Sequence, residues 1–368
     1  MRIYKIALTG GPCVEKTDVF NFLTKRLKEL NYNVITVHET AREFIENGIP
    51  PHGDNEYVIK FQNAILNRQL QKEQDAITLL KDEPTYIILC DRGIMDSKAY
   101  LSNLQFSSIL NSLNKKEVEL RDNYDAVFHL VTAAKGAEKF YSKETNSARR
   151  ENLEEARLAD DRTLSAWAGH PHLRVIDNST GFEDKIRRLI REISSYLGEP
   201  QPYEIERKFL IKYPDLKALN NPTLEKVDII QTYLRKSNPN EEIRIRQRGC
   251  DGHFIYTRTI KKGTGQKRLE TEKRISKDQY LTYLMDADQN YHQIRKTRYC
   301  FVYNNQYLEL DIYPFWKDKA ILEIEINNEN GKVEIPPEIE VIKEVTNDPH
   351  LKNSYIAKNY EKFNQKNP

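Results

Sequence analysis

Residues 204–208 read Glu-Ile-Glu-Arg-Lys, and this stretch decides the expected fold of the second half of the chain. Successive side chains of a β-strand point to opposite faces, so Glu204, Glu206 and Lys208 share one face. The same spacing of two recurs in later segments, at Arg244, Arg246 and Arg248; Arg268, Glu270 and Glu272; Lys296 and Arg298; Glu309 and Asp311; and Glu323 and Glu325. The pattern predicts strands with one charged and one apolar face.

A closed antiparallel barrel would make such strands stable, because its apolar outer face packs on helices and its charged inner face lines a polar tunnel. The alternative is an ordinary solvated sheet face, which is the usual explanation of alternating charges on a single strand. Several strands with separate acidic and basic positions favour the tunnel. We therefore expect an α+β domain with a closed, eight-stranded antiparallel tunnel barrel.

The two sets of charges predict two kinds of ligand. A triphosphate carries about four negative charges near neutral pH, so it needs several cations at once. The expected phosphate-binding residues are Lys208, Arg244, Arg246, Lys261, Arg268, Lys296 and Arg298. The carboxylates would repel one another unless Mg²⁺ or Mn²⁺ lay between them. The expected metal-binding residues are Glu204, Glu206, Glu270, Glu272, Glu309, Asp311, Glu323 and Glu325.

In order along the chain, EIERK, IRIRQR, YTRTIKK, RLETE, KTR, LELD and LEIEI resemble the CYTH family, the triphosphate tunnel metalloenzymes. The resemblance runs from about residue 200 to about residue 358. It assigns metal most directly to Glu204, Glu206, Glu323 and Glu325. Lys208, Glu206 and Arg246 are then the candidate catalytic residues, and water is the expected nucleophile. The family is known for triphosphate hydrolysis, nucleotide cyclisation, RNA end processing and binding without turnover.

The first half of the chain begins with a predicted buried strand, 4–9, which leads into the Gly-rich segment 10–17 and an amphipathic helix. This is the layout of a phosphate-binding loop, whose usual string is GxxxxGK[ST]. Glu15 replaces the second glycine, so we expect a degenerate loop in which Lys16 pairs with Glu15 or Asp18. The expected nucleotide-binding residues are Gly10, Gly11, Lys16, Thr17 and Asp91.

Further predicted strands, 33–40, 86–93 and 126–131, alternate with helices and indicate an α/β domain with a parallel sheet. The segment 141–162 is rich in arginine and glutamate, which is typical of a lid over a nucleotide. Its alternative is a solvated helix with salt pairs one turn apart. The lid arginines are Arg149, Arg150, Arg157 and Arg162.

TGGPC, FQNAILNRQLQKE, CDRGIMDSKAY and GHPHLRVIDN resemble the AAA-type ATPase/kinase-like domain of the translocation-defect proteins. In those proteins this domain is fused to a C-terminal CYTH domain. The resemblance implies nucleotide binding in the first half and polyphosphate or phosphoinositide binding in the second. A terminal helix, 183–197, followed by GEPQPY predicts domains at 1–198 and 200–368.

Composition narrows the class of protein. The chain has 368 residues, a net charge of +2 and 30% charged residues, so it shows no bulk signal for nucleic acid. No apolar run reaches the length of a membrane span. Four scattered cysteines without a CxxC pair favour a reducing cytoplasm. The expected partner is a small molecule with a triphosphate, with ATP, GTP or a phosphoinositide as further candidates.

Three functions remain open from the sequence. The first is a metal-dependent triphosphatase of inorganic tripolyphosphate or of a nucleoside or thiamine triphosphate, with a regulatory or decayed N-terminal domain. The second is a module that binds a phosphoinositide or nucleotide without chemistry. The third is a P-loop kinase whose second domain senses substrate. The paired carboxylates favour the first over the second, and Glu15 counts against the third.

Overall fold

The computed structural model describes residues 2–12, 14, 16–81, 85–138, 152–198, 206–236, 238, 241–262, 269–326 and 332–364. Clustering of contacts divides the chain into two compact units, Met1–Arg191 and Glu192–Pro368. The sequence predicts the boundary between the two domains at 198–200. Residues 199–205 lie outside the described residues, so this boundary stays a prediction. None of the described helices has the length and apolar character needed to cross a membrane.

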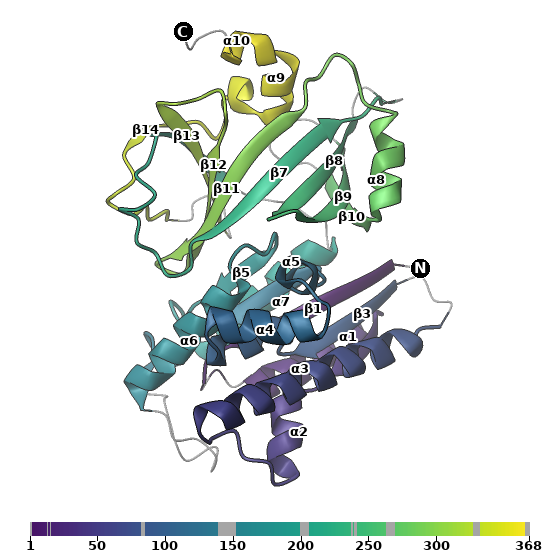
Figure 1. Ribbon diagram of the computed structural model, residues 1–368, viewed down its shortest axis with the longest axis vertical. Coiled ribbons are helices and arrows are strands. Elements are labelled where there is room, and N and C mark those ends of the chain that lie inside the picture. Colours follow the sequence, from purple (N-terminus) through teal and green to yellow (C-terminus); the bar gives the residue numbers. More distant parts are fainter. Residues whose placement is uncertain are drawn as a thin grey trace. The chain divides into compact units, whose positions relative to one another are not determined.

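The N-terminal unit contains a parallel sheet, as the sequence predicted, and the structure shows that it has five strands in the order β2-β3-β1-β4-β5 (Figure 1). Its strands are β1 (Arg2–Gly10), β2 (Asn33–Val37), β3 (Thr85–Asp91), β4 (Ala126–Leu130) and β5 (Leu173–Ile176). Its helices are α1 (Lys16–Glu29), α2 (Thr40–Glu46), α3 (Asn55–Thr78), the 3-10 helix η1 (Ile94–Tyr100), α4 (Asn103–Ser112), α5 (Glu117–Arg121) and α6 (Leu153–Trp167), and the division between the two units falls within α7 (Phe182–Leu197).

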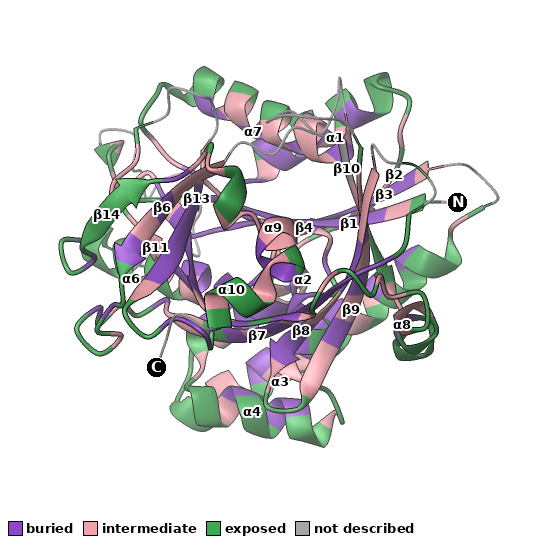
Figure 2. Ribbon diagram, turned by 90° about the horizontal axis from the view of Figure 1, so that it is seen from above, coloured by how far each residue is buried: buried purple, intermediate pink, exposed green. Residues whose placement is uncertain are grey.

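β1 is the central strand of this sheet, and its continuous apolar run is buried because neighbours pair with it on both edges. The helices cover both faces, since α1 lies on one side of β1, β3 and β4 and α3 and α4 lie on the other (Figure 2). β2 and β3 lie on one side of β1, and β4 and β5 lie on the other. Ligands of open parallel sheets bind at the carboxyl ends of the strands at such a switch point.

The C-terminal unit is built on a nine-stranded antiparallel sheet with the order β10-β9-β8-β7-β11-β12-β13-β6-β14. Its strands are β6 (Glu206–Lys212), β7 (Glu225–Tyr233), β8 (Glu241–Cys250), β9 (His253–Lys262), β10 (Leu269–Ile275), β11 (Ile294–Tyr303), β12 (Gln306–Ile312), β13 (Lys319–Glu325) and β14 (Val341–Glu344). Its helices are α8 (Lys277–Leu284), the 3-10 helix η3 (Pro349–Leu351), α9 (Asn353–Lys358) and α10 (Tyr360–Asn364).

The sequence predicts a barrel of eight strands, whereas this sheet has nine. The ninth strand, β14, pairs with the free edge of β6, and all four of its residues are exposed. The sheet is strongly curved, with β6 and β13 on one arm and β9 and β10 on the other (Figures 1 and 2). Among the described residues the pairings end at β10 and β14. A closed barrel therefore stays a prediction.

The apolar face of each strand is the one that packs outward. On one arm Phe209, Ile211, Leu310 and Leu322 belong to one buried cluster, which the segments around Leu219 and Ile339 complete. On the other arm α8 packs on the apolar side of β8, where Tyr280 meets Ile245. Burial of these side chains fixes which face of every strand turns away from the solvent.

The C-terminal helices close off one end of the curved sheet. Ile356 and Ala357 of α9 are buried in a cluster with Tyr233, Ile294 and Tyr313. The Tyr313 hydroxyl donates a hydrogen bond to Asn353 Oδ1 at 2.7 Å. α9 is too short to be stable by itself, so this apolar and aromatic packing holds it in place.

Candidate functional site

Strand register brings the charged positions of the C-terminal unit onto one face of the sheet. Lys208 is opposite Glu323, Glu323 is opposite Glu309, and Arg298 is opposite Asp311. Side chains of register partners lie on the same face. Followed through β7, β8, β9 and β10, this face also carries Arg244, Arg246, Arg248, Lys261 and Glu272. The apolar clusters lie on the opposite face, so we call this one the charged face.

Arg298 is the centre of the charged face. Its guanidinium binds Asp311 through Nε–Oδ1 and Nη2–Oδ2, both 2.7 Å, and binds Glu323 Oε2 through Nη2 at 2.6 Å. Nη1 contacts Glu309. One arginine thereby holds carboxylates from two neighbouring strands, β12 and β13. All four side chains are at most 10% exposed, so the contacts are made in a poorly hydrated environment.

Two lysines complete this network. Lys208 Nζ lies 2.6 Å from Glu323 Oε1 and 3.4 Å from Glu206 Oε1. Burial lowers the pKa of Lys208, but Glu323 and Glu206 outweigh it and hold that pKa above its usual value. Lys296 contacts Asp311, yet burial and the nearby charge of Arg298 lower its pKa to about 8. The two lysines therefore differ in how firmly they keep their charge.

β8 supplies three arginines to the same face. Arg244 and Arg248 are buried, and the Arg246 side chain is 15% exposed. Their register partners on β7 and β9 are all uncharged: Tyr233 and Thr259, Gln231 and Thr257, and Ile229 and Ile255. Arg246 contacts Gln231 at 3.4 Å and Glu272 at 3.9 Å. Positive charge is therefore concentrated on β8, where forked donors suit phosphate oxygens.

Of the other residues predicted for the site in this unit, some lie on the charged face and some are outside the described residues. Glu272 accepts a hydrogen bond from Thr259 at 2.7 Å, and Lys261 is half-buried on β9. Glu204 and Arg268 lie outside the described residues, and for Glu270 only the backbone, in β10, is described. The charged face thus brings together predicted residues of seven strands, β6 and β8 to β13, with these exceptions.

A divalent cation fits one part of this face. Glu206 and Glu325 are register partners on β6 and β13, and like charges in that position repel unless a cation lies between them. Carboxylate oxygens are the ligands that Mg²⁺ and Mn²⁺ prefer. Within the described part of the chain, no group of three or more His, Cys, Asp or Glu is arranged to hold a metal. The metal assignment, which includes Glu204, stays a prediction.

In the N-terminal unit the phosphate loop follows β1 and leads into α1. Lys16, the first residue of α1, is buried and pairs with Asp91 and with Glu39, whose Oε2 is 3.4 Å away. Thr17 accepts a hydrogen bond from Arg42 at 3.2 Å. Asp18 is exposed, so it is not the partner that the sequence suggested for Lys16. Glu15 lies outside the described residues.

The two glycines of the loop meet other elements closely. A Cβ on Gly10, whose φ is +152°, would lie 2.3 Å from the Leu130 carbonyl oxygen. A Cβ on Gly11 would lie 2.7 Å from the Cβ of Asp160. Close packing of the loop against Leu130 and Asp160 therefore requires glycine at both positions, whether or not a nucleotide binds.

Sequence reasoning left three residues out of the site. Glu39 ends the segment after β2, Arg92 follows β3, and Asp160 lies on α6. Asp160 accepts hydrogen bonds from Gly11 N at 2.9 Å and Thr132 N at 3.2 Å, and it contacts His129 Nε2 at 3.0 Å. Burial raises the pKa of Asp160, but His129 and Lys135 outweigh it and keep the carboxyl ionised. The invariant spacing of a phosphate loop gives no signal for such distant partners.

Only the second part of the predicted lid, residues 152–162, lies within the described residues. Residues 139–151, with Arg149 and Arg150, lie outside the described residues. Arg157 and Arg162 belong to α6, where Arg157 donates to Ala134 O at 2.6 Å and contacts Glu138 at 3.0 Å.

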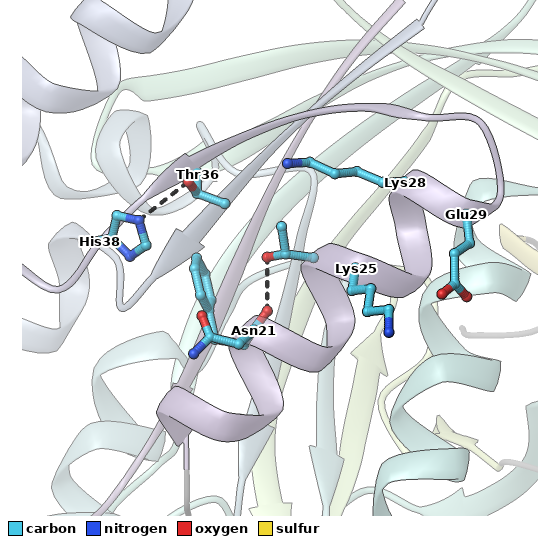
Figure 3. A pocket seen from close by; sticks show the side chains of 8 residues that line it. Asn21, Lys25, Lys28, Glu29, Thr36 and His38 are labelled. Atoms are coloured by element: carbon cyan, nitrogen blue, oxygen red, sulfur yellow. Dashed lines mark hydrogen bonds between the residues drawn. The ribbon is translucent and has the colours of Figure 1, made fainter.

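A hollow of about 590 Å³ lies beside α1 and β2 (Figure 3). His38 and Thr36 contact each other there at 3.4 Å. The lining residues are Phe20, Asn21, Thr24, Lys25, Lys28, Glu29, Thr36 and His38. None of the predicted phosphate- or metal-binding residues lines it.

Comparison with known proteins gives a family match for the first unit. Residues 5–185 match the model of an AAA domain family. No curated protein matches the chain. Among solved structures, the inorganic triphosphatase NE1496 is 29% identical, and the match covers 42% of this chain and 94% of that one with a TM-score of 0.31. PH1819 from Pyrococcus horikoshii is 19% identical over 34% of this chain and 80% of that one, with a TM-score of 0.27. The family match thus places the similarity to AAA domains in the N-terminal region of the chain.

Proposed function

We propose that the charged face of the C-terminal unit binds a triphosphate and hydrolyses it with the help of Mg²⁺ or Mn²⁺. The observation that carries this proposal is the distribution of charge across the register. Carboxylates and bases are paired on β6, β11, β12 and β13, and β8 adds three guanidinium groups, those of Arg244, Arg246 and Arg248, at alternate positions of the same face. Such a row of forked donors suits the oxygens of a polyanion.

The residues of the two arms would have different roles. Arg244, Arg246 and Lys261 would bind phosphate oxygens, because guanidinium groups can make two parallel hydrogen bonds to one phosphate. Lys208 already contacts Glu206 and Glu323, so it would bridge the phosphates and the carboxylates. Glu206 and Glu325, with Glu204, would hold the divalent cation, which would neutralise phosphate charge and lower the pKa of a bound water.

The reaction class is a direct hydrolysis. The oxygen of water forms a bond to the terminal phosphorus, and the bond from that phosphorus to the bridging oxygen breaks. The electron pair of the broken bond leaves with the shorter phosphate chain, and the proton that the water loses passes to the solvent. Lys208 and Arg246 would stabilise the charge on the transferred group because they are positioned before the reaction starts. The N-terminal AAA-type domain would have a regulatory role through its own nucleotide.

A phosphate-release panel tests this function. The substrates are tripolyphosphate, ATP, GTP and thiamine triphosphate, each with and without Mg²⁺ or Mn²⁺. We expect release from at least one of them only with metal. Lys208→Ala should reduce the rate far more than Lys16→Ala, because Lys208 lies on the charged face and Lys16 lies in the phosphate loop. A larger loss from Lys16→Ala would place the chemistry in the N-terminal unit, and no release from any substrate would contradict the proposed hydrolysis.

A further inference from the structure

Glu39 bridges two cations of the N-terminal unit. Its Oε1 lies 2.7 Å from Arg92 Nε, and its Oε2 lies 3.4 Å from Lys16 Nζ. The two cations come from different elements, since Lys16 begins α1 and Arg92 follows β3. One anion that binds a lysine with one oxygen and an arginine with another makes the contacts that a phosphate group would make. The carboxylate of Glu39 thus makes two contacts of the kind that a phosphate group makes, beside Asp91, which also pairs with Lys16, and Asp96, which lies 3.5 Å from Arg92.

Local structure does not explain a glutamate at this position. Glu39 is the N-cap residue of α2, where Ser, Thr, Asp and Asn are favoured, and its side chain makes no capping hydrogen bond. Its side chain is 19% exposed, compared with 6% for Lys16 and 5% for Asp91. Glu39 is therefore more accessible than Lys16 and Asp91 and as accessible as Arg92, at the start of a short helix. It is the carboxylate that an incoming anion would displace first.

Arg92 is held in an unusual backbone conformation. Its φ is +69°, in the left-handed region that residues other than glycine rarely adopt. Its N–H donates to Leu8 O at 2.9 Å, and Nη1 donates to Gly10 O at 3.1 Å. The Gln69 amide lies 3.5 Å from its carbonyl oxygen. These contacts hold the guanidinium beside the phosphate loop, and such strain typically marks a functional position.

The charge of Glu39 is permanent in the pH range of an assay. Burial raises the pKa of this carboxyl, but Lys16 and Arg92 outweigh the effect and lower it to about 2. A change of pH between 5 and 9 therefore leaves the negative charge of Glu39 between Lys16 and Arg92.

We propose that Arg92 is a phosphate-binding residue of the N-terminal unit and that Glu39 is a resident competitor for Lys16 and Arg92. A ligand must carry enough negative charge to displace the carboxylate. The site therefore selects nucleoside triphosphates over monophosphates, since a triphosphate carries about four negative charges and a monophosphate about two. This proposal does not depend on the hydrolysis proposed for the C-terminal unit.

Hydrogen exchange on the full-length protein tests the proposal, because it localises binding. The chain is titrated with ATP, ADP and AMP in magnesium buffer, and protection is followed in peptides that cover 9–20 and 36–46. Peptides that cover 241–250 report the C-terminal unit separately. We expect ATP to protect the N-terminal peptides at concentrations on the order of tenfold or more below AMP.

Glu39→Gln keeps the size of the side chain and removes the competing charge. We expect this variant to bind ATP on the order of tenfold more tightly and to lose most of its preference over AMP. Arg92→Gln should weaken ATP binding by a similar factor, and Arg92→Lys should restore part of it. Glu43→Gln is the matched control, because Glu43 lies on the same helix and pairs with Arg68 and Lys72 instead.

Three outcomes would overturn the proposal. One is ATP affinity in Glu39→Gln that equals that of the wild type or of Glu43→Gln. Another is unchanged ATP binding in Arg92→Gln. The third is the absence of ATP protection in the N-terminal peptides of the wild type. Thermal unfolding of each variant shows whether it is folded, and Glu39→Asp, which shortens the carboxylate, gives an independent measurement if Glu39→Gln is unstable.

Discussion

Arg298 and Asp311 face each other across β11 and β12, and two nitrogens of the guanidinium bind the two oxygens of the carboxylate, each at 2.7 Å. The same guanidinium also contacts Glu309 and Glu323. An exposed ion pair contributes little to stability, but a buried charge that loses its partner is costly. This contact therefore ties the fold of the C-terminal unit to the charge balance of its candidate site.

Arg298→Lys should destabilise the C-terminal unit by about 2 to 5 kcal/mol. Lysine keeps the positive charge but cannot satisfy three carboxylates at once, so buried anions would be left without hydrogen bonds. Urea unfolding followed by circular dichroism measures the loss. Arg295→Lys is the matched control, because Arg295 lies on the same strand, is exposed and contacts only Gln293 among the hydrogen bonds described for it. An equal effect in both variants would contradict the central role of Arg298.

Glu206→Gln and Glu325→Gln should each abolish metal-dependent phosphate release. The two carboxylates are register partners, so loss of either charge removes half of the pair that would hold the cation. We expect the unfolding free energy to change by less than about 1 kcal/mol, because neither residue belongs to the contacts of Arg298. Phosphate release as a function of Mg²⁺ and Mn²⁺ concentration checks the prediction. Wild-type rates in both variants would rule out this metal site.

Lys296 should make activity fall in alkaline solution. Burial and Arg298 lower its pKa to about 8, so the free enzyme loses this positive charge as the pH rises through 8. We expect kcat/KM to decline above pH 8. The decline in kcat should lie at higher pH, because a bound polyanion favours the protonated lysine. Lys296→Arg should remove the decline in kcat/KM, since arginine keeps its charge, and a decline that persists in this variant would assign it to another group.

The same shift predicts the pH dependence of stability. The pKa of Lys296 in the folded state, about 8, is below the value of about 10.4 for an exposed lysine. Between these two values the unfolded chain binds more protons than the folded one. The contribution of Lys296 to the unfolding free energy therefore rises as the pH increases from 8 to 10.4. Urea unfolding of the wild type and Lys296→Met across this range would show a difference in slope, and parallel curves would contradict the shift.

Gly11→Ala should destabilise the N-terminal unit by about 1 to 3 kcal/mol. The new methyl group would lie 2.7 Å from the Cβ and 2.8 Å from the Oδ1 of Asp160, which also accepts the Gly11 N–H. Gly181→Ala is the control, since a Cβ there has no neighbour within 4 Å, and its cost should stay below about 1 kcal/mol. Thermal unfolding measures both. A tolerated Gly11→Ala would show that α6 can move away from the loop.

The faces of the strands were decided by local sequence. The spacing of two in segments such as 204–208 and 244–248 fixes which side chains point the same way, because the side-chain period of a strand is two whatever it pairs with. The apolar side chains on the other face of each strand are buried only if that face packs against helices and loops. The run of apolar residues in β1 indicated a strand that is buried on both faces, as in a parallel sheet covered by helices. The Gly-rich segment after it indicated a phosphate loop.

Only the tertiary structure decided which charges meet. Register places Arg298 opposite Asp311 and Glu323 opposite Glu309, and a shift of one strand by two residues would keep every face and change every pair. β14 escaped prediction because an exposed edge strand carries no apolar alternation. Glu39, Arg92 and Lys16 are 23 to 76 residues apart and meet only because parallel strands end at one edge of the sheet. Sequence spacing fixes direction within a strand, whereas contacts between strands depend on the packing of the whole unit.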